Sequence, residues 1–360
     1  MPKATSHIER GSAEDLRTEL RKIAPGTALR EGIDMVRAAH SGALIVIGDE
    51  ERVIPLCSGG FDINVPFTPQ RLYELAKMDG AIVMDNDGEH ILKANVHLVP
   101  DAALPTSETG MRHRAAERMG LQTRAIALAL SQRRATVNIY LMGRRFLLEE
   151  TETVLVRADQ ALQTLLRYRS ALDATLGKLT TLEFQDLVTI DDITEALGRF
   201  ETVKRVAREV SRYVGELGTE GRLVKMQMEE LTAGVDDVYL LFLRDYAAKD
   251  SARDAQILMD HLRTVPLERL LEPDVASSEF GLRPSQRTDE HLSPRGYRVL
   301  AEIPMLPIAV INRIVDRFGH LPGLLTADAE DLVRVEGVGA RRARAITIGL
   351  ARVRSHVAVV

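Results

Sequence analysis

The spacing of apolar residues changes at about residue 150, and this change limits most strongly how the chain can fold. Before it, short apolar runs rich in β-branched residues alternate with amphipathic segments, which predicts an α/β domain. After it, leucines and valines recur every three or four residues as far as Leu262, which predicts helices. A chain of 360 residues has room for two or three domains, each with its own core.

We therefore expect a multidomain α+β protein in three parts. Residues 1–150 form an α/β domain around a central mixed sheet, residues 151–288 form an all-helical scaffold, and residues 289–360 form a small helical domain. The segment from Glu272 to His291 is rich in proline, serine and charge, which predicts a hinge before the last domain.

The first 100 residues contain the clearest strand signals. The continuous apolar run from Ala43 to Gly48 predicts a buried central strand, and residues 53–57 are predicted as its partner. A helix that begins at Thr68 and Pro69 leads to another apolar strand at residues 81–84. The turn Asn86-Asp87-Gly88 then predicts a hairpin.

Two arginines flank a histidine directly after a glycine in the stretch Gly110-Met111-Arg112-His113-Arg114. Good helix formers follow, so the stretch is predicted to form the first turn of a helix. Free backbone N–H groups, the positive end of the helix dipole and two guanidiniums would together make an anion site suited to phosphates. The alternative is a solvated helix start in which the arginines pair with Glu117.

Asp79 and Gly80 lie where the predicted helix ends and the strand of residues 81–84 begins. Gly80 removes side-chain bulk, so a ligand can approach the backbone there. A carboxylate that holds a divalent cation, together with arginines that hold phosphates, is what metal-assisted nucleotide chemistry requires. The alternative is an ordinary aspartate in a turn that ends a helix.

The last seventy residues contain a second candidate binding segment. Residues 291–360 hold ten arginines and no lysine against six acidic residues, a formal charge of +4 in a chain whose total is −5. Within them, Gly337-Val338-Gly339 followed by Arg341 and Arg342 fits a helix-hairpin-helix pattern. Such a hairpin brings bare N–H groups to a DNA phosphate without reading bases. The alternative is a plain glycine turn between two helices.

Composition favours a cytoplasmic protein. The single cysteine, Cys57, excludes an internal disulfide, and we expect it to be a small core residue. No stretch approaches the roughly 18 apolar residues of a membrane span, and the N-terminus lacks a signal-peptide core. We expect no membrane association.

The pair Asp79-Gly80-Ala81 and Gly110-Met111-Arg112-His113-Arg114 resembles the motifs of the diadenylate cyclase domain. Nearly the whole chain resembles the DNA integrity scanning proteins, bacterial diadenylate cyclases with a C-terminal helix-hairpin-helix domain. The resemblance implies that residues 1–150 condense two ATP molecules into cyclic di-AMP and release two pyrophosphates. It also implies coupling to branched or non-specific DNA and to DNA-damage checkpoint signalling, in a nucleoid-associated cytoplasmic protein.

The same resemblance assigns roles to individual residues. Asp79 would bind Mg²⁺ or Mn²⁺ and the 3′-hydroxyl, and Arg112 and Arg114 would neutralise phosphates. His113 would donate to a phosphate or help to form the pocket. The residues expected to contact ATP are Gly80, Leu98, Gly110, Met111, Arg112, His113, Arg114 and Ser131. Those expected to contact DNA are Gly337, Gly339, Arg341 and Arg342.

One domain holds one ATP, so two domains must face each other, and the family forms an octamer. The chain departs from the family at Met111, where the family has threonine, so a hydroxyl donor is lost. We expect a slow but real cyclase. Two alternatives stay open: a nucleotide-binding DNA sensor without catalysis, and a DNA-repair-associated protein that acts through its tail.

Overall fold

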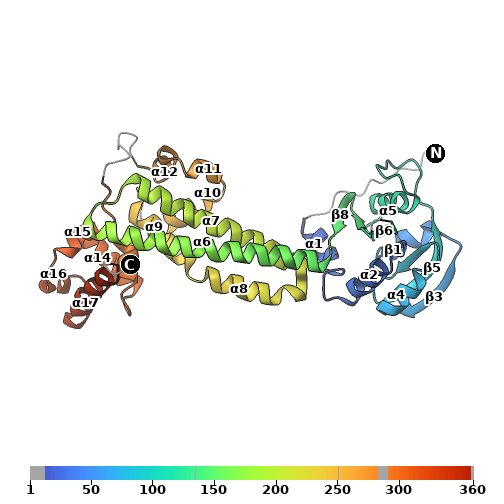
Figure 1. Ribbon diagram of the computed structural model, residues 1–360, viewed down its shortest axis with the longest axis horizontal. Coiled ribbons are helices and arrows are strands. Elements are labelled where there is room, and N and C mark those ends of the chain that lie inside the picture. The colour runs from blue at the N-terminus through green and yellow to red at the C-terminus, as the bar shows by residue number, and fades with distance from the viewer. Residues whose placement is uncertain (1–12, 134, 250, 283–290, 358–360) are drawn as a thin grey trace. The chain divides into compact units, whose positions relative to one another are not determined.

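The computed structural model describes residues 13–133, 135–249, 251–282 and 291–357, drawn in colour in Figure 1. The described residues divide into two compact units. The first contains the residues up to Ala158 together with Arg212–Leu223, and the second contains Asp159–Ser211 and the residues from Val224 onward.

An eight-stranded mixed sheet forms the centre of the described part of the first unit. The strands run in the order β2-β5-β4-β1-β6-β7-β8, and β3 also pairs with β5. Strands β1 and β4 are parallel, and the other pairs are antiparallel. The strands are β1 (Ala43–Ile47), β2 (Cys57–Ser58), β3 (Phe61–Pro66), β4 (Ala81–Met84), β5 (His90–Leu98), β6 (Ile126–Leu130), β7 (Val137–Leu141) and β8 (Arg144–Leu148).

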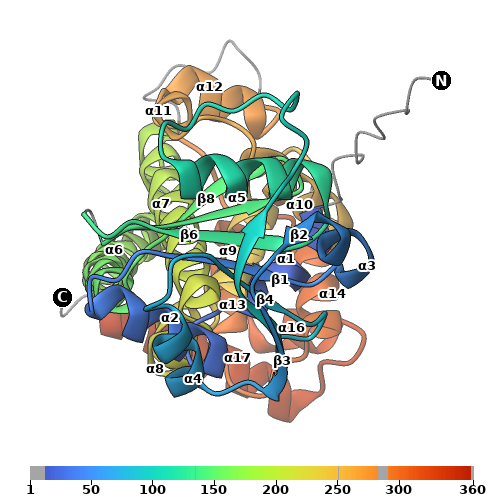
Figure 2. The ribbon, with the colours of Figure 1, turned by 90° about the vertical axis from the view of Figure 1, so that its right-hand side faces the viewer.

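Helices cover both faces of this sheet, which is why its central strands are apolar at every position. Helices α1 (Ala13–Arg21), α2 (Ala28–Ala38) and α4 (Pro69–Leu75) share one core with alternate residues of β1, such as Ile45. Helix α5 (Met111–Gln122) packs on the opposite face, against residues such as Val46. Figure 2 shows α5 on one side of the sheet and α2 and α4 on the other.

The strand predicted for residues 53–57 was wrong. The chain forms helix α3 (Glu50–Val53) and a short 3-10 helix, η1 (Ile54–Leu56), before β2 begins. Pro55 has no N–H to donate to a strand ladder, and Glu50 stabilises the positive end of a helix dipole. Cys57 is half-buried, and burial raises the pKa of its thiol, as expected of a residue used for packing.

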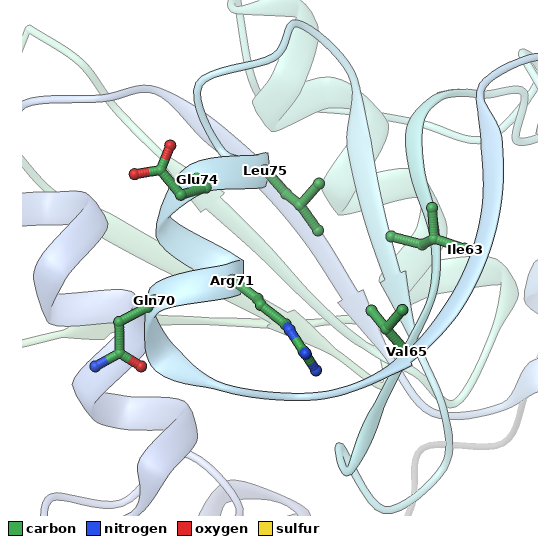
Figure 3. Close-up of a pocket in the computed structure, with 6 residues that line it drawn as sticks. All are labelled: Ile63, Val65, Gln70, Arg71, Glu74 and Leu75. Atoms are coloured by element: carbon green, nitrogen blue, oxygen red, sulfur yellow. The ribbon is translucent and has the colours of Figure 1, made fainter.

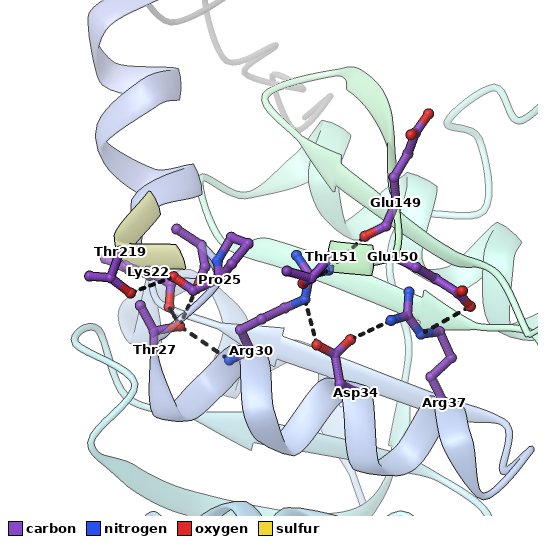
Figure 4. A network of polar contacts seen from close by, with 11 residues as sticks. Lys22, Pro25, Thr27, Arg30, Asp34, Arg37, Glu149, Glu150, Thr151 and Thr219 are labelled. Carbon is purple, nitrogen blue, oxygen red and sulfur yellow. Dashed lines mark hydrogen bonds and ion pairs between the residues drawn. The ribbon is translucent and has the colours of Figure 1, made fainter. Parts of the chain in front are cut away.

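A polar network in the first unit joins α2 to the beginning of α6 (Thr151–Gln185), as Figure 4 shows. The buried Arg30 side chain donates to Asp34 Oδ2 at 2.9 Å and to the Glu149 carbonyl at 2.6 Å. On the other side of Asp34, Arg37 donates to Oδ1 at 2.7 Å. The start of α6 is therefore held to α2 within the first unit.

The second unit is helical. Helices α6 and α7 (Ile190–Leu217) lie side by side in Figure 1, bridged by an ion pair of 3.2 Å between Lys178 and Asp192. The remaining described helices of the chain are η2 (Gly218–Gly221), α8 (Arg222–Thr232), α9 (Val235–Tyr246), α10 (Ala252–Leu262), α11 (Leu267–Leu270), α12 (Pro273–Glu279), α13 (Tyr297–Ala301), α14 (Ile308–Phe318), α15 (Leu321–Leu325), α16 (Ala329–Val333) and α17 (Ala340–Val357). An α/β region followed by helices alone confirms the predicted fold class.

The hinge predicted from Glu272 to His291 was wrong for its first part, since α12 covers Pro273–Glu279. Residues 283–290, with the proposed boundary at 288, lie outside the described residues. The domain boundaries at 150 and 288 stay predictions. Within the described ranges, no helix combines the length and apolar character that crossing a membrane demands.

Candidate functional site

Four strand ends meet at one edge of the sheet of the first unit. Ala81 begins β4 and pairs with Leu44 of β1 and with Val96 of β5. Ala43 pairs with Leu130, the last residue of β6. The register therefore brings four predicted site residues to this end of the sheet. Asp79 and Gly80 directly precede β4, Leu98 is the last residue of β5, and Ser131 directly follows β6.

The N-terminus of α5 lies at the same edge. Gly110 is its extended N-cap and has no side chain that could cap the N–H groups of the first turn. Met111 is the first helical residue, and its side chain is 86% exposed. The helix is held close to the sheet at Gly120, where an added Cβ would lie 2.8 Å from the Tyr140 backbone. Because α5 begins at Met111, its first turn contains Arg112, His113 and Arg114, as predicted.

The two sequence motifs touch through Arg112 and Asp79. Nη2 of Arg112 lies 3.0 Å from Oδ1 of Asp79, and the Asp79 carboxylate is fully exposed to solvent. Exposed ion pairs contribute little to stability. An arriving phosphate and metal ion can therefore exchange for the two partners at small cost.

Gly80 serves a structural purpose that the sequence reasoning missed. Its φ is +135°, and an added Cβ would lie 2.7 Å from Oδ1 of Asn95 and 2.8 Å from the Asn95 backbone. Gly60 packs against the same strand, 2.8 Å from the Asn95 carbonyl by the same measure. Asn95 has a φ of +55° within β5. An asparagine inside a strand was the available signal for this irregularity, because asparagine adopts a positive φ more readily than most residues.

The loop before α5 is fixed by carboxylates. Glu117 of α5 accepts hydrogen bonds from Ser107 N at 3.0 Å and from the hydroxyl of Thr106. Glu108 accepts from the Tyr140 hydroxyl at 2.8 Å and pairs with Arg145 at 2.8 Å. Burial and the hydrogen bond to Glu108 raise the pKa of Tyr140. Glu117 was considered only as a partner for arginines, and its role in holding the loop was missed.

The other predicted residues surround this edge with different exposure. Leu98 is buried at the end of β5, while His113 and Ser131 are half-buried. Arg114 is exposed, and its backbone N–H donates to the Gly110 carbonyl at 2.9 Å. Ser131 N donates to the Thr136 carbonyl at 2.9 Å, which closes a turn.

A metal ion at this edge would rely on few protein ligands. The described residues contain no group of three or more histidine, cysteine or acidic side chains able to hold a metal. The single exposed carboxylate of Asp79 fits Mg²⁺ or Mn²⁺ bound mainly by nucleotide phosphates. The donor set therefore suits a cation that arrives with ATP.

A separate pocket of about 400 Å³ lies between β3 and α4. Figure 3 shows its lining residues, Ile63, Val65, Gln70, Arg71, Glu74 and Leu75. It contains none of the residues predicted to bind ATP.

The glycine hairpin of the second unit lies between helices α16 and α17. Gly337 has a φ of +86°, and Val338 is buried, which anchors the turn between exposed Gly337 and Gly339. Helix α17 begins at Ala340 with Arg341 and Arg342 both exposed. An Arg342 Nη1 group donates to the Gly337 carbonyl at 2.6 Å.

Comparison with known proteins identifies the α/β part of the chain as a nucleotide-binding domain of the diadenylate cyclase class. The family model for the nucleotide-binding region of the bacterial checkpoint controller DisA matches residues 30–145, and the model for its linker region matches residues 148–288. The chain belongs to the DisA family of DNA integrity scanning proteins. This confirms the resemblance seen in the sequence.

Individual relatives match over most of their length. The DNA integrity scanning protein of Carboxydothermus hydrogenoformans is 47% identical over 338 residues, which cover 94% of this chain and 96% of the relative. The protein of that name from Bacillus subtilis (strain 168) is 42% identical, with 94% of each chain covered. Among solved structures, a double mutant of DacA from Staphylococcus aureus matches with a TM-score of 0.29 and 19% identity, over 38% of this chain and 89% of that one.

Proposed function

We propose that this protein condenses two ATP molecules into cyclic di-AMP and two pyrophosphates. Its family contains the diadenylate cyclases, so a nucleotidyltransferase is the expected class of enzyme. The observation that carries the proposal is the 3.0 Å contact between Arg112 and Asp79, because it joins the two motifs at the positive end of α5.

In the proposed reaction, the 3′-oxygen of each ATP bonds to the α-phosphorus of the other, and the bond from that phosphorus to pyrophosphate breaks. Arg112 and Arg114, with the free N–H groups of α5, neutralise the phosphate charge, and His113 donates to a phosphate oxygen. Asp79, released from Arg112, would hold the metal ion beside the 3′-hydroxyl, and the proton of that hydroxyl passes to solvent water. A bound Mg²⁺ or Mn²⁺ ion supplies further charge neutralisation.

The adenine and its phosphates would also contact backbone and apolar groups at the sheet edge. Leu98 supplies an aliphatic wall, Gly80 and Gly110 offer backbone groups, and Ser131 reaches the phosphates from the end of β6. Because one domain holds one nucleotide, two copies must face each other. We therefore propose a homo-oligomer, with the octamer of the family as its form.

The size of the effect of Met111 on catalysis decides between a slow enzyme and a second candidate function. Its exposed thioether has no donor where the family has a hydroxyl, so one hydrogen bond to phosphate is lost. If the loss of this hydrogen bond abolishes catalysis, the protein is an ATP-binding DNA sensor. We favour a slow cyclase, because the ion pair, the helix terminus and the glycine backbone are all present.

We further propose that the second unit binds DNA, branched or non-specific, through Gly337, Gly339, Arg341 and Arg342. Exposed backbone at the hairpin and two exposed guanidiniums support contact with phosphate rather than with bases. Cyclase output would then report DNA integrity in the cytoplasm, at the nucleoid. A repair-associated protein without a working nucleotide site is the remaining alternative.

The test is incubation of the purified protein with ATP and Mg²⁺ or Mn²⁺, with nucleotides resolved by chromatography. Asp79→Asn should abolish cyclic di-AMP. Asp87→Asn is the matched control, since Asp87 is exposed in the turn at the opposite end of β4. ATP binding without product would favour the sensor. No ATP binding by the wild type would overturn the nucleotide function.

A further inference from the structure

The last five helices contain an internal repeat. Helices α13 and α16 begin at Tyr297 and Ala329, and α14 and α17 begin at Ile308 and Ala340, so both pairs are offset by 32 residues. Buried residues follow the same offset, in the pairs Leu300 and Leu332, Ile303 and Val335, Ile311 and Ala343, and Ile314 and Ile346. The loop between α13 and α14 is therefore the counterpart of the glycine hairpin.

The two hairpins share an unusual backbone position. Gly337 has a φ of +86°, and its counterpart one repeat earlier, Met305, has a φ of +63°. A residue with a Cβ atom is uncommon in this region, where it is strained. The Met305 side chain is 94% exposed, so packing within the described chain does not offset the strain. Backbone strain that packing does not offset is a sign of a functional constraint.

The Gly337 hairpin also packs against α14. A Cβ built on Gly337 would lie 3.0 Å from Nη1 of Arg313 and 3.5 Å from a Val310 side-chain carbon. Both residues belong to the first two turns of α14, the helix that the Met305 hairpin introduces. Arg313 also donates to the Glu336 carbonyl at 3.1 Å. A ligand held by the Gly337 hairpin therefore lies close to the Met305 hairpin.

The two hairpins differ in polarity. The Gly337 hairpin has bare backbone and is followed by arginines, which suits phosphate. The Met305 hairpin is uncharged from Pro304 to Ala309, and Ile308 is half exposed beside the methionine. An apolar side chain gains nothing from a phosphate, but it gains contact area against the face of an unstacked base. The pair therefore suits DNA in which a phosphate and an open base step lie close together.

We propose that Met305 is an apolar wedge that contacts unstacked bases in DNA, while the Gly337 hairpin holds a phosphate nearby. This inference rests on the DNA binding proposed above. It assigns the two hairpins different tasks: the Gly337 hairpin provides affinity for any DNA, and Met305 provides preference for DNA with interrupted stacking, such as a bulge or a junction.

The test uses the full-length protein and its Met305→Gly variant at one salt concentration. Binding is measured to a continuous duplex, to the same duplex with a two-base bulge, and to a four-way junction. Glycine is free to adopt the positive φ, so the variant should keep or gain thermal stability. We expect about tenfold weaker binding to the bulge and the junction, and no change for the continuous duplex.

Ile257→Ala is the matched control, because Ile257 is an exposed apolar residue of α10 in the same unit, and it should change none of the three affinities. A 2-aminopurine placed at the bulge should respond to the wild type and not to Met305→Gly. Equal weakening for all three DNAs, or none, would overturn the wedge and leave the DNA-binding function standing. A wild type that binds no DNA would overturn both.

Discussion

Gly42 and Arg112 occupy adjoining space so closely that a Cβ atom on Gly42 would lie 2.3 Å from Nη1 of Arg112. Gly42 immediately precedes β1, the strand that lies between β4 and β6. The guanidinium therefore passes over the end of β1 on its way to Asp79. The absence of a side chain at residue 42 positions a proposed phosphate-binding group that belongs to another element.

Gly42→Ala should lower cyclic di-AMP synthesis by about ten- to a hundredfold, because the methyl group displaces Arg112. Folding should survive, since the Gly42 backbone is not in the positive-φ region that alanine avoids. Turnover and Tm are measured side by side. Gly177→Ala, in an open position of α6, is the control and should leave turnover unchanged. Unchanged turnover in Gly42→Ala would refute this role.

Met111→Thr should raise the turnover rate. A hydroxyl at the first position of α5 restores one charge-assisted hydrogen bond, worth about 1.5–3 kcal/mol, or roughly ten- to a hundredfold if it forms in the transition state. Met111 is 86% exposed, so the change should leave Tm nearly unaltered. Met111→Leu, which adds no donor, is the matched comparison. Equal rates for the threonine and leucine variants would contradict this account.

The two hairpin glycines should respond differently to alanine. Gly337 has a positive φ and would bring a Cβ to 3.0 Å from Arg313, whereas a Cβ on Gly339 would meet nothing within 4 Å. Gly337→Ala should therefore cost about 1–2 kcal/mol of stability, and Gly339→Ala should cost little. Both should weaken DNA binding. Full DNA affinity in Gly339→Ala would argue against close approach of a phosphate at this hairpin.

Local pattern was enough to predict several elements of the chain. The buried strand at Ala43 and the helix start at Met111 were both confirmed, because burial on two faces and a glycine before helix formers leave local signatures. The prediction of a strand at residues 53–57 was wrong, because it gave more weight to the β-branched residues than to Pro55. Strand propensity reflects packing more than backbone preference.

The assembly of the site was less predictable. The position of β1 between β4 and β6 depends on the strand order, which spacing in the sequence does not reveal. Neither Gly42 nor Asn95 could therefore be connected to the motifs by spacing alone. The 32-residue repeat was equally hidden, since its first hairpin has Met305 where the second has glycine. The resemblance to a family supplied the pairing of Asp79 with Arg112, which the fold then placed in contact.

A buried polar cluster was also missed, although it connects three helices of the second unit. The Asp245 carboxylate of α9 accepts from the backbone N–H groups of Gly296 at 2.7 Å and Tyr297 at 2.6 Å, where α13 begins. The Arg298 guanidinium forms an ion pair with Glu183 of α6. Glu183 also accepts from the Tyr246 hydroxyl at 2.6 Å. Removing one partner from such a buried pair is strongly destabilising.

This cluster should make the stability of the protein depend on pH. Burial, and then the nearby Glu183 carboxylate, raise the pKa of Asp245 from 3.8 to about 7. Between these values the folded protein holds a proton that the unfolded chain has released. The stabilisation from Asp245 is therefore complete below about pH 4 and is lost as the pH rises through 7.

We expect Tm to fall as the pH rises from about 4 to about 7, and Glu183→Gln to flatten that fall, because it removes a charge that raises the Asp245 pKa. The variant should also be less stable at low pH, since Arg298 loses its charged partner. Glu216→Gln, at an exposed position of α7, is the control and should keep the wild-type slope. A slope in Glu183→Gln as steep as in the wild type would show that the pH dependence arises elsewhere.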